Sequence, residues 1–125
     1  MIDHISVGVS NLDRSAAFYE ATLATLGLTR LITRPRTIGF GKSYPEFWIN
    51  LREAMPPVAP ESGVHICLRA KTTAEVDAFH AAALVSGGAS DGAPGIRPHD
   101  RVRYYAAFIV DPDGNRIEAV TFPSE

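Results

Sequence analysis

The length, composition and charge of this chain leave out several classes of protein. Its 125 residues suffice for one domain that folds without a disulfide or structural zinc, and a net charge of −2 provides no basic surface for nucleic acid or anionic lipid. Its single cysteine, Cys67, excludes an internal disulfide and a cysteine-based zinc site. No secretory signal is visible in residues 1–4 and the sequence following them, and no apolar run approaches about 20 residues, so we expect a cytoplasmic protein that spans no membrane.

The chain resembles itself when it is shifted by 61 residues, so that His4 falls on His65. The same shift superimposes Phe18 on Phe79, and Gly27 on Gly88. Secondary-structure signals align together with these identities, which favours an internal repeat.

In the first half, residues 2–9 alternate between apolar and polar side chains, as in a half-buried strand. Asn11 can cap a following amphipathic helix, and Gly27 can end it. Three short strands are expected next, at about 28–33, 36–42 and 46–51.

The second half repeats this order. Residues 64–69 alternate, Thr72 or Thr73 caps a helix that ends at glycines 87–88, and the sequence DPDGN at 111–115 indicates a tight turn. Three further strands are expected at about 89–96, 102–110 and 115–121. The proline-rich segment 53–62 joins the halves.

These elements predict an α+β fold. Two βαβββ modules, at about 1–53 and 63–122, form a curved mixed sheet with the helices outside and a groove inside. We expect residues 1–125 to form one domain.

Period-2 alternation directs His4 and His65 away from the helices and into the groove. Glu118 is expected to point into the same groove from the last strand. It lies within an apolar segment, where burying an isolated carboxylate is costly. Aligning residues 48–51 with 116–119 places Asn50 opposite Glu118. Two imidazoles and one carboxylate are typical ligands of Fe, Mn, Ni, Zn or Co in a site that keeps positions open for substrate.

The strand histidine, the sequence GVHI at residues 63–66, the DPDGN turn and the following strand IEAV resemble the vicinal oxygen chelate superfamily. This superfamily includes glyoxalases, bleomycin resistance proteins and extradiol dioxygenases. The resemblance covers essentially the whole chain and implies a divalent metal held by His4, His65 and Glu118, which binds two adjacent oxygens of a substrate. Glyoxalase I has a further Glu or Gln where this chain is expected to place Asn50, so the assignment to glyoxalase I itself is weakened.

Other residues are candidates for the remaining roles. His99 and Tyr104 are candidate acid or base residues, with His99 on a loop that could cover the metal. The candidate substrate-binding residues are Trp48, Asn50, Arg97 and Cys67. Each has a simpler alternative. His99 could lie on a solvated loop without a functional role, Trp48 could belong to the core, and Cys67 could be a small residue in the wall of the groove.

Several functions are compatible with this pattern. The first is a metal-dependent enzyme of the glyoxalase type, acting on a small oxygenated substrate by lyase, isomerase or dioxygenase chemistry. The second is a non-catalytic protein that sequesters a small molecule, as bleomycin resistance proteins do. A third, a resistance transferase, would need cations such as Arg97, Arg101 and Arg103 to gather around an anion. A homodimer is expected, because the first strands offer edges that need cover.

Overall fold

The computed structural model describes residues 1–124 and contains both modules. The elements of the first module are β1 (Ile5–Val9), α1 (Leu12–Ala24), β2 (Thr29–Thr33), β3 (Thr37–Gly41) and β4 (Pro45–Leu51). Those of the second are β5 (Ile66–Arg69), α2 (Thr73–Val85), β6 (Ala89–Arg97), β7 (Tyr104–Val110) and β8 (Arg116–Thr121). The connection between them contains one 3-10 turn, η1 (Pro60–Ser62). The predicted fold class is therefore confirmed.

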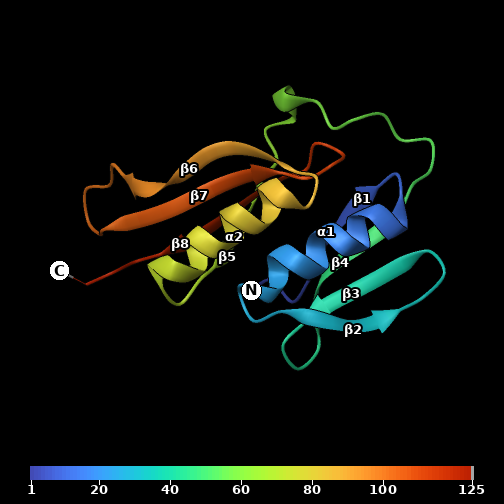
Figure 1. The fold of residues 1–125 in the computed structure, drawn as a ribbon, viewed down its shortest axis with the longest axis horizontal. Helices are drawn as coiled ribbons and strands as arrows, with labels where there is room; N and C mark the ends of the chain where they lie inside the picture. The colour runs from blue at the N-terminus through green and yellow to red at the C-terminus, as the bar shows by residue number, and fades with distance from the viewer. Residues whose placement is uncertain (125) are drawn as a thin grey trace.

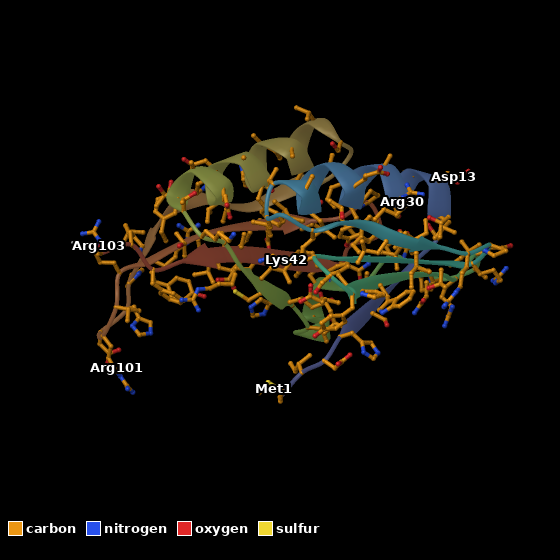
Figure 2. All side chains as sticks on the ribbon, turned by 90° about the horizontal axis from the view of Figure 1, so that it is seen from below. Met1, Asp13, Arg30, Lys42, Arg101 and Arg103 are labelled. Carbon is orange, nitrogen blue, oxygen red and sulfur yellow. The ribbon has the colours of Figure 1, made fainter. Side chains whose placement is uncertain are left out.

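The expected mixed sheet consists of two four-stranded sheets, with strand orders β1-β4-β3-β2 and β5-β8-β7-β6. In each sheet the first strand of the module pairs in parallel with the last, and the other pairs are antiparallel. The helices α1 and α2 lie side by side (Figure 1) and cover the same side of the sheets (Figure 2). The opposite face of the sheets, where Figure 2 shows Met1, is left without a helix. Neither helix has the length and apolar character needed to cross a membrane.

The repeat extends to the ends of the helices. Both helices have 13 residues, and each begins at a polar cap: Asn11 accepts a hydrogen bond from the backbone N–H of Arg14, and Thr72 accepts one from Glu75. Gly27 and Gly87 follow the helices with φ angles of 81° and 103°, which glycine adopts without steric cost. The two modules therefore share their local structure as well as their order of elements.

The buried core spans both modules. Its largest members include Phe18 and Tyr19 of α1, Phe47 of β4 and Phe79 of α2, each no more than 1% exposed. The ring of Tyr19 meets that of Phe18 edge-on, with centroids 4.9 Å apart, and lies 5.0 Å from that of Phe47. Because the buried residues of both modules form one cluster, the hydrophobic core itself joins the two modules.

The turn between β7 and β8 connects the second module to the first. The buried hydroxyl of Tyr19 donates to Oδ2 of Asp111 over 2.6 Å, and the side-chain amide of Asn115 donates to the carbonyl of Gly8 over 2.9 Å. Asp113 accepts hydrogen bonds from the backbone N–H and the hydroxyl of Ser10. Burial raises the pKa of Asp111, and burial together with Asp111 raises the pKa of Tyr19. The turn predicted from DPDGN is thus also the polar junction between the modules.

Gly88 allows close packing at this junction. A Cβ atom at this position would lie 2.5 Å from the ring of Phe18 and 2.7 Å from the carbonyl oxygen of Val110. We therefore expect Gly88→Ala to lower the free energy of unfolding by about 1–3 kcal/mol, since both neighbours are held in place. Denaturant unfolding measures this, with Gly95→Ala as control, where the nearest atom is the flexible end of Arg97 at 3.4 Å. Equal stability of the two variants would contradict this expectation.

His80 of α2 makes the stability dependent on pH. Its Nε2 atom lies 2.8 Å from the hydroxyl of Ser90, and burial lowers the pKa of His80 while Asp77 partly opposes this. As pH falls below about 6.5, the unfolded chain binds a proton at this residue before the folded chain does, so stability falls. His80→Gln should lose less stability than the wild type between pH 8 and pH 5 in denaturant unfolding. Parallel stability curves would contradict this assignment.

Candidate functional site

The starts of β1 and β5 line one cavity of about 510 Å³. Residues 2–5 form one wall and residues 65–68 the other, with Glu46 beside them. His4 and His65, which the repeat predicts to be equivalent, therefore open into the same space. Each lies one residue ahead of the first residue of its strand.

The carboxylate of Glu118 lies behind His65 and contacts two side chains. Glu118 is 2% exposed, and its backbone pairs with that of Cys67 on β5, while its neighbours Ile117 and Ala119 pack into the core. Its Oε1 atom lies 3.1 Å from Nε2 of His65, and its Oε2 atom accepts a hydrogen bond from the hydroxyl of Tyr104. Both oxygens of this buried carboxylate therefore have a partner, the imidazole on one and the phenol hydroxyl on the other.

This environment keeps two neighbouring groups protonated. Desolvation, followed by the charge of Glu118 and a hydrogen bond to it, raises the pKa of the Cys67 thiol to about 12. Desolvation and the hydrogen bond to Glu118 also raise the pKa of Tyr104. The thiol is therefore not an activated nucleophile at neutral pH, and the Tyr104 hydroxyl serves as a hydrogen-bond donor.

His4 does not join this group. Its side chain is 55% exposed, and its Nδ1 atom lies 2.7 Å from the carboxylate of Asp3. Within residues 1–124 there is no set of three His, Cys, Asp or Glu side chains arranged to hold a metal ion. The structure thus brings His65 and Glu118 together, with Tyr104 and Cys67 beside them. His4 lines the same cavity as His65 and Cys67 without joining this group.

The pairing of strands corrects the position expected for Asn50. Trp48 pairs with Ser6 on β1, and Glu118 pairs with Cys67 on β5. Because Ser6 and Cys67 are equivalent in the repeat, Trp48 is the counterpart of Glu118, and the alignment that placed Asn50 there was out of register by two residues. The first module therefore offers an aromatic ring where the second offers a carboxylate. The side chain of Asn50 instead accepts a hydrogen bond from the hydroxyl of Thr37 over 2.5 Å.

Trp48 is packed on two sides. A Cβ atom on Gly39 would lie 2.9 Å from its ring, and the guanidinium of Arg34 lies 5.6 Å from the ring centroid. The ring is only partly buried. For a ligand to stack on Trp48, the side chain of Arg34 would have to move.

The loop between β6 and β7 places its candidate residues differently. The ring of His99 stacks on that of Tyr104, with centroids 5.9 Å apart and an interplanar angle of 8°. Because the hydroxyl of Tyr104 donates to Glu118, Tyr104 links His99 to Glu118. Figure 2 shows Arg101 and Arg103 extending outward from the loop. Arg97 donates to the carbonyls of its own segment, at Ala93 and Gly95. The three arginines therefore do not surround one anion site.

Sequence reasoning missed the aromatic residues that surround Glu118. Phe108 pairs directly with Glu118 across β7 and β8, and the guanidinium of Arg97 lies 5.4 Å from its ring centroid. Phe122 meets Tyr104 edge-on at 5.5 Å and carries Arg69 on its face at 4.5 Å. Phe108 lies four residues after Tyr104 on β7, and Phe122 lies four residues after Glu118. Because side chains an even number of positions apart in a strand share a face, this spacing could have identified both.

The comparison with known proteins identifies the family. A family model described as the Glyoxalase/Bleomycin resistance protein/Dioxygenase superfamily matches residues 1–119. The chain belongs to this superfamily. A glyoxalase/bleomycin resistance protein from Albidiferax ferrireducens is 32% identical in sequence, with a TM-score of 0.85 over 96% of this chain and 98% of that one.

More distant members of the glyoxalase superfamily share the fold. A glyoxalase I variant from Zea mays is 21% identical, with a TM-score of 0.70 over 94% of this chain and 44% of that one. A fosfomycin resistance protein from Listeria monocytogenes is 16% identical, with a TM-score of 0.68 over 96% of this chain and 91% of that one. A search of curated proteins gave no match.

Glyoxalase-superfamily proteins often bind divalent metals, and His65 and Glu118 are two donors of this chain that lie close together. Two ligands about 2.1 Å from one ion, at right angles to each other, lie about 3 Å apart. His65 Nε2 and Glu118 Oε1 are 3.1 Å apart. This separation matches two adjacent positions around an ion, but no third His, Cys, Asp or Glu among residues 1–124 completes the set.

Proposed function

We propose that this glyoxalase-superfamily protein is a metal-dependent enzyme acting on a small oxygenated substrate. In this proposal His65 and Glu118 are two of the metal ligands and His4 is the third. The single observation that carries it is the 3.1 Å contact between a cavity-lining imidazole and a buried carboxylate on adjacent strands.

The chain's own residues would each have a defined part. The hydroxyl of Tyr104 occupies Oε2 of Glu118 and so leaves Oε1 for the ion. A divalent ion held there would bind two adjacent oxygens of the substrate and act as a Lewis acid. His99, stacked on Tyr104, is the candidate proton carrier on the loop between β6 and β7. Lyase, isomerase and dioxygenase chemistry all remain open with Fe, Mn, Ni, Zn or Co.

We further propose that the protein is a cytoplasmic homodimer. Both β1 and β5 are edge strands of their sheets, and an uncovered edge favours pairing with another chain. A second copy could also bring its own His4 to the His65–Glu118 pair. The single cysteine, which cannot form an internal disulfide, is consistent with a reducing compartment.

A second candidate function is sequestration of a small molecule without catalysis. It is favoured by the absence, among the residues that the structure describes, of a three-residue cluster able to hold an ion. In that case His65 would be a polar group in the wall of a binding cavity, held in place by Glu118.

Metal content separates the two functions. The protein is purified without an affinity tag, loaded with each candidate metal, passed through a desalting column and measured by mass spectrometry. The enzyme requires one bound ion per site, lost in His65→Ala and in His4→Ala and retained in the control His80→Gln, which lies outside the cavity. Wild-type protein that keeps no metal after any loading would refute the enzyme and support sequestration.

A further inference from the structure

The loop between β6 and β7, residues 98–103, is held by one histidine side chain. The backbone N–H groups of Arg101 and Val102 donate to Nδ1 of His99 over 3.1 and 3.3 Å. Within residues 1–124, the residues of this loop make no other hydrogen bond. The conformation of the loop therefore depends on a single atom that can gain a proton.

These two hydrogen bonds require the neutral form of His99. Its Nδ1 atom accepts a hydrogen bond only while it carries no proton, so the neutral ring holds its proton on Nε2. In the charged form both ring nitrogens are donors, and the proton on Nδ1 would face the two backbone N–H groups. Histidine side chains change charge between about pH 5 and pH 8. Gain of a proton in this range would therefore break both bonds that hold the loop.

The charged ring has another partner within reach. Oδ1 of Asp100 lies 3.7 Å from Nδ1 of His99, and the Asp100 side chain is 91% exposed, so a small rotation brings the carboxylate to hydrogen-bond distance. Arg101 and Arg103, on the same loop, oppose the positive charge of the ring. Nδ1 thus has two alternative sets of partners, backbone N–H groups when the ring is neutral and a carboxylate when it is charged.

The elements packed against the loop add few charges. On β7, desolvation and the hydrogen bond to Glu118 raise the pKa of Tyr104, so that its hydroxyl stays neutral throughout this range. Residues 122–124 line a cavity with the loop and are uncharged. Arg69 lies 4.5 Å from the ring centroid of Phe122 and adds a positive charge on that side. Within the described residues, the exposed carboxylate on the loop is thus the acidic group placed to stabilise a charged imidazole.

The neutral ring of His99 also covers Tyr104. The two rings are stacked, with centroids 5.9 Å apart and an interplanar angle of 8°. Two cavities of about 500 and 450 Å³ are lined by this loop, and Tyr104 lines the second. The position of the loop therefore decides how far Tyr104, and the Glu118 carboxylate to which it donates, is covered.

We propose that His99 is a pH-sensitive switch of the β6–β7 loop. The neutral ring holds the backbone of residues 101–102 and covers Tyr104. The charged ring, with one more proton on Nδ1, turns to Asp100, releases both backbone N–H groups and uncovers Tyr104. This proposal goes beyond the proposed function, because it concerns the metal-free chain and uses no bound ion.

NMR spectroscopy of the metal-free protein between pH 8 and pH 5 tests the switch. At pH 8 the imidazole nitrogen signals of His99 should place its proton on Nε2, and the backbone order parameters of Arg101 and Val102 should be about 0.85, as in rigid backbone. At pH 5 the order parameters should fall below about 0.6, as in flexible backbone. The through-space signals between the rings of His99 and Tyr104 should be lost over the same pH range.

Four variants assign the change to the proposed atoms. His99→Asn retains a side-chain acceptor that cannot gain a proton, so the loop should stay ordered at both pH values. His99→Ala has no acceptor, so the loop should be flexible at both. Asp100→Asn removes the carboxylate that favours the charged ring and should move the transition to lower pH. His80→Gln is the control, because His80 contacts Ser90 outside the loop, and it should leave the transition unchanged.

Three results would overturn the switch. Order parameters of Arg101 and Val102 that stay high in the wild type at pH 5 would show that the charged ring does not release the loop. Low values already at pH 8 would show that the neutral ring does not hold it. Equal losses of order between pH 8 and pH 5 in the wild type and in His99→Asn would assign the pH dependence to another group. The proposed function would be unaffected by any of these results, because no metal takes part.

Discussion

Replacing Glu118 by Gln is expected to lower the affinity for zinc by about 100-fold or more, because even residues that only orient metal ligands change affinity by about 10- to 100-fold. The amide is nearly the same size as the carboxylate and can still accept the hydrogen bond from Tyr104. It removes the charge that the ion requires.

The same variant should leave the metal-free fold almost unchanged. Glu118 is 2% exposed, so a neutral amide costs less free energy to bury there than a carboxylate. The amide also makes a weaker contact with His65 or Tyr104, and these two effects on the free energy of unfolding should cancel to within about 1 kcal/mol. Zinc titration followed by calorimetry and denaturant unfolding of the metal-free protein measure the two effects separately. Glu46→Gln is the matched control, since Glu46 lines the same cavity without contacting Glu118 or His65 in a hydrogen bond.

An equal loss of affinity in the Glu46 and Glu118 variants would show that the cavity attracts zinc only by its general negative charge. A large loss of stability in Glu118→Gln, with unchanged zinc affinity, would assign Glu118 a structural role.

Removal of Asp111 is expected to have the largest effect on stability. Its carboxylate accepts hydrogen bonds from the hydroxyl of Tyr19, the backbone N–H groups of Asp113 and Asn115, and the side chain of Asn115. Asp111→Ala leaves several buried donors unpaired, each at a cost of about 1–3 kcal/mol, so we expect a loss of about 3 kcal/mol or more.

The comparison with Tyr19→Phe shows whether this loss comes from the junction. The phenylalanine variant removes one hydrogen bond and retains the ring in the core, so its loss should be smaller, about 1–2 kcal/mol. Denaturant unfolding gives both values. Equal losses in the two variants would mean that Asp111 matters only as the partner of Tyr19.

The fold was predictable because each module repeats the same local signals. Alternating strands, the caps Asn11 and Thr72, and the turn at 111–115 appear in the structure where the sequence indicates them. The polar junction of that turn with α1 was not predictable, because it joins residues more than 90 positions apart that no local pattern links.

The site was only partly predictable for a related reason. Alternation identified His65 and Glu118, whose contact depends on the parallel pairing of β5 with β8. Alignment of a four-residue segment chose Asn50 over Trp48, because the register between strands depends on loop lengths that the segment does not contain. His4 and His65 both precede the first paired residue of their strands, so alternation alone does not fix either side chain: His65 lies against Glu118, whereas His4 lies against Asp3.

The position of an ion in crystals of the zinc-loaded protein tests the central claim most directly. X-ray data collected on both sides of the zinc absorption edge should give one anomalous peak per site, within bonding distance of His65 Nε2 and Glu118 Oε1. A peak elsewhere on the molecule, or crystals of fully loaded protein in which His65 and Glu118 still contact each other with no ion between them, would contradict it.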